Sequence, residues 1–369
     1  MKKNNLDDII VLEHMILKRL KHYPQYHDLF IEKVTASIKQ YYAEITSTFA
    51  QNLLSIELQG RDPYGFFTIG KDIWIAFEKD SEQIIGFEVI TRKRGGSIKL
   101  GPTYMMSNVR KRGYATEMIE GLIGIYKSLS FRKVYVTAPL SHASTAVLDY
   151  CKLKFSLEAI LCKHYAKDSS DRVCGLLFDN EIRCHSALKI RTEYGKGVLT
   201  QISIDKEKMF EVSEFSCFIK NNMKDSFSDI DDDFVNSILN GIKNGICSKY
   251  EIKGKCVLLG WDNDKLISLS VATLKRGGVI KIVPFLVAEE YINIPNILWI
   301  LNEIEELAKK NNRRKITLFI PVTDFAITNI ISGKGYLSEG VLREPYKKGV
   351  DITVFSKFLD SGGSDINEL

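Results

Sequence analysis

The second half of this 369-residue chain repeats residues of the first half at a constant offset of 182 positions, as from Lys93 to Lys275. The same offset, which falls to 181 near the end of each half, relates the following segments: Lys93-Arg94-Gly95-Gly96 and Lys275-Arg276-Gly277-Gly278, Lys99 and Lys281, Pro102 and Pro284, Arg132-Lys133 and Arg314-Lys315, Pro139 and Pro321, Phe155 and Tyr336, and Tyr165 and Tyr346. So steady a register predicts two copies of one fold.

Length and composition agree with this organisation. A chain of this length with 45% hydrophobic residues is expected to form two packed cores. We therefore expect one domain at residues 1–190 and a second at residues 191–369.

The residue pattern predicts an α/β fold. Strands are expected at 73–77, 84–90, 97–106, 133–138 and 198–204, because these runs are rich in β-branched and aromatic residues and are bounded by turn residues. Helices are expected at 116–129 and 297–309, in the segment 25–55 and between 207 and 244. Residues 9–20 are also predicted to be an amphipathic helix, because Ile9, Leu12, Ile16 and Leu20 recur at helical spacing. Gly101-Pro102 is expected to interrupt the pairing of its strand.

Residues 107–116, between a predicted strand and a predicted helix, favour the binding of a phosphate group. Arg110, Lys111 and Arg112 are consecutive cations, and Gly113 and Ala115 are small enough to let a ligand approach the backbone. The first amides of the helix have no partner within the helix and point toward such a ligand. The Walker A pattern and the dinucleotide-binding glycine pattern are both absent.

The pattern Arg-x-x-Gly-x-Ala at 110–115 resembles the pyrophosphate-binding motif of GNAT-fold N-acetyltransferases. Residues 143–155 resemble the second signature of that family, with matches at Ala146, Tyr150 and Phe155 and departures at Ala143, Asp149 and Lys154. The resemblance covers residues 72–178 in the family's element order. It implies a mixed, splayed central sheet flanked by helices in each copy, with a pantetheine arm entering where two strands separate.

The resemblance also implies the chemistry. An acetyl group would pass from acetyl-CoA directly to an amine on a small molecule or a peptide, with segment 25–55 contributing to acceptor choice. Tyr150 matches the family's general acid, and a strand amide near Met106 would polarise the thioester carbonyl. The implied cofactor-binding residues are Met105, Met106, Arg110, Lys111, Arg112, Gly113, Tyr114, Ala115 and Thr116.

The second copy lacks this loop. At the offset of 182, Arg110, Gly113 and Ala115 fall on Ile292, Pro295 and Ile297, so the charge is lost and larger side chains replace the small ones. We therefore expect residues 191–369 to be a degenerate partner of the first copy.

The general base is not determined by the sequence. The strand 97–106 has no carboxylate, and Glu88 and His142 are candidates. A water chain, or an amine that arrives neutral, would serve equally. The missing carboxylate leaves open an alternative function, a catalytically inactive acyl-CoA-binding sensor or scaffold.

Composition argues against other functions. With 51 basic and 46 acidic residues, the net charge of +5 is too balanced to predict nucleic-acid binding. The chain shows neither a signal-type apolar core nor a membrane-length apolar run, and its seven scattered cysteines suit a reducing cytoplasm. No metal site is expected, because the Cys and His spacing fits no zinc pattern and the acidic run 229–233 lacks the residues of a calcium loop. That run is expected to cap a helix. The oligomeric state stays open.

Overall fold

The computed structural model describes residues 8–42, 45–62, 65–140, 152–165, 167–178, 190–204, 211–244 and 255–359. The chain divides into two compact units. Unit 1 comprises residues 1–161, 169–183 and 343–349, and unit 2 comprises 162–168, 184–342 and 350–369. Each unit thus includes a short segment from the other half of the sequence.

Unit 1 contains one sheet with the strand order β1-β2-β3-β4-β5-β6-β8-β7, in which only β5 and β6 pair in parallel. Its elements are β1 (Ile9–Val11), β2 (Met15–Arg19), α1 (His27–Lys39), α2 (Ser47–Gln59), β3 (Thr68–Glu78), β4 (Ile84–Lys93), β5 (Ser97–Met105), α3 (Tyr114–Ser128), β6 (Lys133–Pro139), β7 (Ser156–Leu161) and β8 (Asp171–Leu177).

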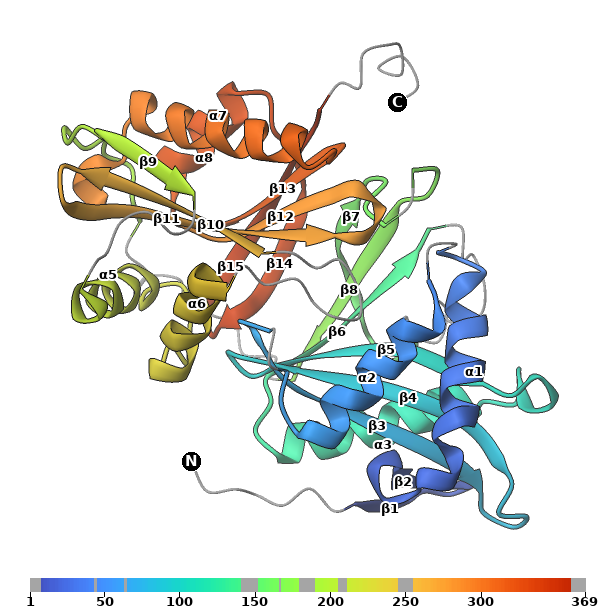
Figure 1. Ribbon diagram of the computed structural model, residues 1–369. Helices are drawn as coiled ribbons and strands as arrows, with labels where there is room; N and C mark the ends of the chain where they lie inside the picture. The colour runs from blue at the N-terminus through green and yellow to red at the C-terminus, as the bar shows by residue number, and fades with distance from the viewer. Residues whose placement is uncertain are drawn as a thin grey trace. The chain divides into compact units, whose positions relative to one another are not determined.

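Helices cover both faces of this sheet (Figure 1). On one face, Phe30 and Val34 of α1 and Leu53 of α2 pack against residues of β3 and β4 such as Ile75 and Phe87. On the other face, buried side chains of α3 pack against the alternate residues of the same strands. Because successive strand residues point to opposite faces, one strand supplies both cores. The predicted mixed α/β sheet flanked by helices is confirmed.

The N-terminal segment is a pair of strands, so the predicted helix at 9–20 is wrong. β1 and β2 form a hairpin, and Met15–Arg19 pairs with β3. The burial of β2 alternates, with Met15 and Leu17 buried in the sheet and Arg19 buried among polar groups. Arg19 donates to Glu57 at 2.7 Å and to Asp72 at 2.8 Å. Tertiary pairing and this buried ion pair therefore outweigh the helical spacing of the apolar residues.

Unit 2 contains strands in the order β9-β10-β11-β12-β13-β15-β14. Its elements are β9 (Gln201–Ile204), α5 (Val212–Met223), α6 (Asp232–Asn244), β10 (Lys255–Asp262), β11 (Lys265–Lys275), β12 (Val279–Val287), α7 (Ile294–Lys310), β13 (Lys315–Pro321), α8 (Phe325–Gly333), β14 (Leu337–Lys347, whose last residues belong to unit 1) and β15 (Val350–Phe358).

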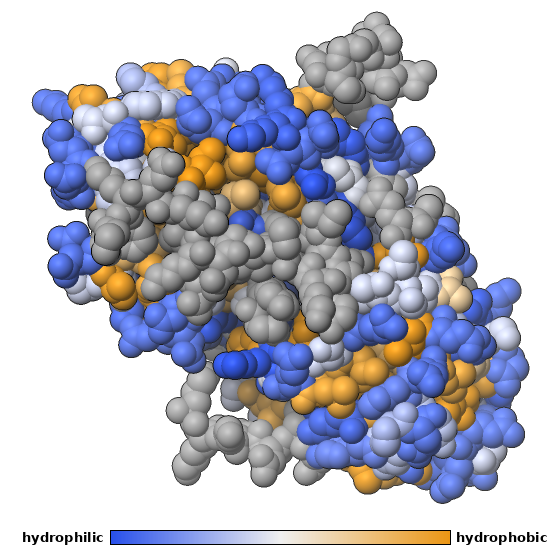
Figure 2. Space-filling model, viewed as in Figure 1, coloured by the Kyte–Doolittle hydropathy of each residue, from blue (hydrophilic) through white to orange (hydrophobic). Residues whose placement is uncertain are grey.

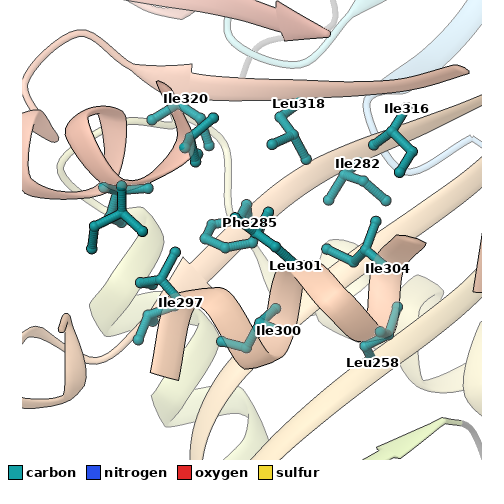
Figure 3. Packing of buried hydrophobic residues seen from close by; sticks show 14 of the residues in the cluster. Leu258, Ile282, Phe285, Ile297, Ile300, Leu301, Ile304, Ile316, Leu318 and Ile320 are labelled. Carbon is teal, nitrogen blue, oxygen red and sulfur yellow. The ribbon is translucent and has the colours of Figure 1, made fainter. Parts of the chain in front are cut away.

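The main core of unit 2 lies between α7, α8 and the sheet. Figure 3 shows Ile297, Ile300, Leu301 and Ile304 of α7 directed toward strand residues such as Phe285. Asp231 accepts a hydrogen bond from the amide of Phe234 at 2.8 Å at the start of α6, which confirms that the acidic run caps a helix.

The two units share pairing details at the offset found in the sequence. β5 and β6 pair from Ser97–Lys133 to Leu100–Val136, and β12 and β13 pair from Val279–Lys315 to Ile282–Leu318. The register shifts between Glu88 and Ile90 in unit 1 and between Ser270 and Ala272 in unit 2. In both units a parallel pair thus ends after four residue pairs, next to an irregular antiparallel pair.

Hydrophilic residues occupy much of the face shown in Figure 2, with apolar residues between them. None of the helices in the described part of the chain combines the length and the apolar character that a membrane span requires.

Substitution of Gly95 tests the packing of unit 1. Its φ of +79° disfavours any other residue, and an added Cβ would clash with the backbone of Tyr346 in the same unit. We expect Gly95→Ala to lower stability by more than about 2 kcal/mol in chemical denaturation. Gly124→Ala, on the exposed face of α3 with open space around it, is the matched control and should raise stability by up to about 1 kcal/mol. Equal effects of the two substitutions would contradict this account.

Candidate functional site

The site predicted from the sequence lies where β5 and β6 separate. Beyond Leu100 and Val136 the two strands are no longer paired with each other, while β5 stays paired with β4 and β6 with β8. The predicted interruption at Gly101-Pro102 is confirmed, since the register of β5 on β4 shifts at this point. The separation leaves the inner edge of residues 101–105 without a strand partner on the β6 side.

The amide near Met106 differs from the expectation. The N–H of Met106 donates to the carbonyl oxygen of Ile85 at 2.9 Å, so this amide is engaged within the sheet. Because successive amides of a strand point to opposite sides, the N–H of Met105 points toward the side where β6 has separated. Met105 therefore replaces Met106 as the amide that faces the separation.

The loop after β5 has the backbone that its sequence predicts. A single 3₁₀ turn, Ser107–Val109, leads to Lys111 with φ of +65° and to Gly113 with φ of +86°. An added Cβ at Gly113 would meet nothing within 4 Å, so conformation rather than crowding requires the glycine. Helix α3 begins at Tyr114, two residues earlier than predicted, and no side chain caps it. Its first amides, from Tyr114 to Thr116, are therefore the ones without intrahelical acceptors.

The cations of the loop have different environments. The Nε of Arg110 donates to the carbonyl of Met105 at 3.0 Å, which ties its side chain back to the strand. Arg112 lies over the ring of Tyr114 at 4.9 Å and 3.7 Å from the carboxylate of Glu78. Lys111 is exposed. Hydrogen bonds from Ser81 and Tyr114 lower the pKa of Glu78. Two carboxylates, Glu78 and Glu117 in the first turn of α3, lie near the loop with its three cations, which leaves a formal excess of positive charge.

The corresponding loop of unit 2 is closed by its own chain. The side chain of Asn293 accepts from the amide of Asn296 at 3.0 Å and so caps α7. Asn293 and Asn296 also donate to the carbonyl of Gly197 at 2.8 and 2.9 Å, and Gly195 donates to Ile292 at 2.7 Å. The segment before β9 thus lies across the start of α7, where unit 1 has an exposed basic loop.

Glu88 is fully buried beside the separation of β5 and β6. Its carboxylate accepts from the amide of Gly101 at 2.9 Å, at the point where β5 leaves its regular register. Burial raises the pKa of Glu88 to about 8, and hydrogen bonds from Thr103 and Gly101 oppose this rise only in part. At the offset of 182 its counterpart is Ser270, so this carboxyl belongs to unit 1 alone.

A buried carboxylate also lies near the far end of β6. Tyr42, which follows α1, donates its hydroxyl to Asp171 at 2.7 Å. Asp171 is buried at the start of β8, opposite Pro139 at the end of β6. Sequence reasoning missed Asp171, because it predicted no strand at residues 171–177 and so gave no reason to place this carboxylate next to the end of β6. Tyr150 and His142 lie outside the described residues, and their predicted roles stay predictions.

Similarity to known proteins was found only among solved structures. No protein-family model and no curated relative matches the sequence. A GNAT-family acetyltransferase from Bacillus anthracis is 12% identical, covers 46% of this chain and 98% of its own, and has a TM-score of 0.37. A probable GNAT-family acetyltransferase from Chromobacterium violaceum is 18% identical, covers 46% and 86%, and has a TM-score of 0.38. An enzyme from Salmonella typhimurium that modifies the N-terminal serine of ribosomal protein L7/L12 is 11% identical, covers 46% and 99%, and has a TM-score of 0.37.

Two of these three structures are described as members of the GNAT family. All three are described as acetyltransferases, and each lies on somewhat less than half of the chain.

The raised pKa of Glu88 predicts a pH-dependent stability difference. Above about pH 4.5 the unfolded chain loses the Glu88 proton while the folded chain keeps it, so this group costs the wild type stability progressively up to about pH 8. Glu88→Gln has no such proton, so its stability relative to the wild type should rise by a few kcal/mol between pH 5 and pH 8. Thermal denaturation across this range measures the difference.

The Glu306→Gln variant on α7 is the control for removing a carboxylate that lies at the surface. A Glu88→Gln difference that does not change with pH would show that Glu88 is ionised in the folded protein.

Proposed function

We propose that unit 1 is an acetyl-CoA-dependent N-acetyltransferase domain that transfers an acetyl group to an amine. The observation that carries the proposal is the exposed, positively charged loop at the uncapped start of α3, which directly follows the strand edge left open by the separation of β5 and β6. Acetyl-CoA contains both groups that these two features suit: a pyrophosphate, which would bind at the loop, and an extended pantetheine arm, which would lie along the strand edge.

The loop suits a pyrophosphate for physical reasons. The first amides of α3 supply donors, the helix start favours negative charge, and Lys111 and Arg112 add exposed cations. Arg110 is held against the carbonyl of Met105, so it also fixes the junction between loop and strand. The open space over Gly113 lets a phosphate approach the backbone.

The acyl transfer itself is direct. The neutral amine nitrogen attacks the thioester carbonyl carbon and forms a C–N bond, the nitrogen loses one proton to water, the C–S bond breaks, and the CoA thiolate leaves and takes up a proton. The amide of Met105 is the donor that we assign to the carbonyl oxygen as negative charge develops on it. Tyr150 remains our candidate for the proton donor to the thiolate.

Glu88 is assigned a positioning role. Its side chain is fully buried and holds the amide of Gly101, so it supports the irregular part of β5 rather than reaching an amine directly. The attacking amine therefore loses its proton to water or arrives neutral. Asp171 and Tyr42 lie at the end of β6 and would contact the acceptor, a small molecule or a peptide.

We also propose that unit 2 is a degenerate copy of the same fold. The shared end of the parallel pair, the shared register shift and the repeated sequence support a common origin of the two units. The loop closed by Asn293 and Asn296 supports acetyl-CoA binding in unit 1 alone.

Calorimetric titration with acetyl-CoA tests the cofactor site. We expect one saturable site per chain, and we expect the double variant Lys111→Glu, Arg112→Glu to bind at least about tenfold more weakly, since two attractive charges become repulsive. Lys127→Glu reverses a charge in the last turn of the same helix, roughly 20 Å from the loop, and should bind as the wild type does. Two sites per chain would contradict the assignment of unit 2, and no binding would sink the acetyltransferase proposal.

The alternative function, an inactive acyl-CoA-binding sensor, is supported by the burial of Glu88. An assay of acetyl transfer distinguishes it from the enzyme. Release of the CoA thiol is followed in the presence of a panel of primary amines and peptides with free N-termini. Acetyl-CoA binding without amine-dependent thiol release would favour the sensor.

A further inference from the structure

Each unit contains one segment from the other half of the sequence, and the two segments occupy the same place in the repeat. Unit 1 contains residues 343–349, the end of β14 and the turn that follows it, and unit 2 contains residues 162–168, which follow β7. We call them the β14 segment and the β7 segment. At the offset of 181 the β7 segment falls residue by residue on the β14 segment. The two halves thus exchange the same part of the repeat.

Backbone carbonyls of the β14 segment accept hydrogen bonds at the start of the parallel pair in unit 1. The ammonium group of Lys133 is buried and donates to the carboxylate of Glu158 and to the carbonyl of Arg343. The buried hydroxyl of Ser97 donates to the carbonyl of Pro345 at 2.9 Å. Ser97 and Lys133 are also the first residue pair between β5 and β6. Because a buried donor without an acceptor is costly, the β14 segment stabilises this end of the two strands.

Side chains and backbone shape fix the same segment. The carboxylate of Glu344 lies 3.1 Å from the guanidinium of Arg132, which also donates to the carbonyl of Gly95 at 2.9 Å. At Gly95 the φ is positive, and an added Cβ would clash with the backbone of Tyr346. The ring of Tyr346 packs against Phe67, with the ring centroids 4.8 Å apart. Glu344 and Tyr346 are both buried.

Unit 2 holds the β7 segment by equivalent contacts. Lys315 is buried, and its ammonium group donates to the carbonyl of Cys162 and, at 2.6 Å, to the carboxylate of Glu339. The amide of Cys162 donates to the same carboxylate at 2.8 Å. The guanidinium of Arg314 donates to the carbonyl of Lys163. At the offset of 181 or 182, each of these residues is the counterpart of one that takes part in the contacts of the β14 segment.

The residues that hold the two segments are among those that the two halves share. In unit 2 a Cβ at Gly277 would clash with the carbonyl of Tyr165, which is the counterpart of the clash in unit 1. The shared residues are Gly95 and Gly277, Arg132-Lys133 and Arg314-Lys315, Glu158 and Glu339, and Tyr165 and Tyr346. The cationic loop before α3 is present in the first half alone. Both halves thus keep the residues that bind a segment, although they differ at the loop.

We propose that the two halves complete each other, so that each unit reaches its full stability only with the segment from the other half bound. The interaction surface in unit 1 is the turn between β4 and β5 together with the start of β6, and its partner is the β14 segment. Reciprocal exchange of an identical element is the geometry of domain-swapped dimers, and here both copies belong to one chain.

The exchange has a consequence for the candidate site, and this consequence rests on the proposed function. The residue pair that the β14 segment holds, Ser97 and Lys133, is the closed end of the separation that opens beyond Leu100 and Val136. The second half therefore contributes to the cofactor site of unit 1, although its own loop is closed. This contribution is a physical reason for keeping a degenerate copy in the chain.

Hydrogen exchange of the full chain without acetyl-CoA, measured by mass spectrometry, tests the proposal. Tyr346→Ala removes a buried ring from the β14 segment, so it should speed amide exchange in β5 and β6 at least about tenfold, and by more than in α7 and β13. Tyr336→Ala is the matched control, because Tyr336 is a buried tyrosine of the same half that belongs to the core of unit 2. It should speed exchange in α7 and β13 by more than in β5 and β6.

Two further variants complete the test. His164→Ala changes a buried residue of the β7 segment and should speed exchange in β12 and β13 by more than in β5 and β6. Should Tyr346→Ala not fold, as judged by circular dichroism, Glu344→Gln replaces it and should act on the same strands. Wild-type exchange in β5 and β6 of the β14-segment variant, or the pattern of Tyr336→Ala in that variant, would overturn the proposal. Because no acetyl-CoA is present, a failure of the proposed function would not change this result.

Discussion

The separation of two parallel strands is the constraint on which the candidate site depends. Backbone donors and acceptors left by a strand that loses its partner must be satisfied by another group. β5 and β6 stop pairing with each other after four residue pairs, but β5 stays paired with β4 and β6 with β8, so the sheet remains continuous. The side chain of Glu88 accepts a hydrogen bond from the amide of Gly101. The amide of Met105 faces the opening between the strands. One irregular stretch of β5 therefore sets both the shape of the site and its donors.

The two units show how local changes redirect the same scaffold. Both have the separated strands, but only unit 1 has an exposed basic loop at the start of the following helix. In unit 2 the side chain of Asn293 accepts from the amide of Asn296, and the segment 195–199 lies against the same turn. The amide of Gly195 donates to the carbonyl of Ile292, and the amide of Leu199 donates to the side chain of Asn296 at 3.0 Å. A long anionic ligand loses both its charge partners and its access there.

The sequence predicted strands β3, β4, β5 and β6 and the interruption in β5, because each depends on local pattern or on glycine and proline chemistry. It failed at residues 9–20, where helical spacing of apolar residues concealed a strand. The engaged amide of Met106 and the raised pKa of Glu88 depend on tertiary register, which no local pattern encodes.

Buried charges also lie in unit 2, near the point where β12 and β13 separate. Replacing a buried ion pair by apolar residues of similar volume is often neutral or stabilising, because the cost of removing the charges from water offsets their attraction. The guanidinium of Arg191 stands 3.6 Å from the carboxylate of Asp324, and burial raises the pKa of this carboxyl to about 6. The folded chain therefore gains little stability from this pair, whose position depends on tertiary structure and not on local pattern.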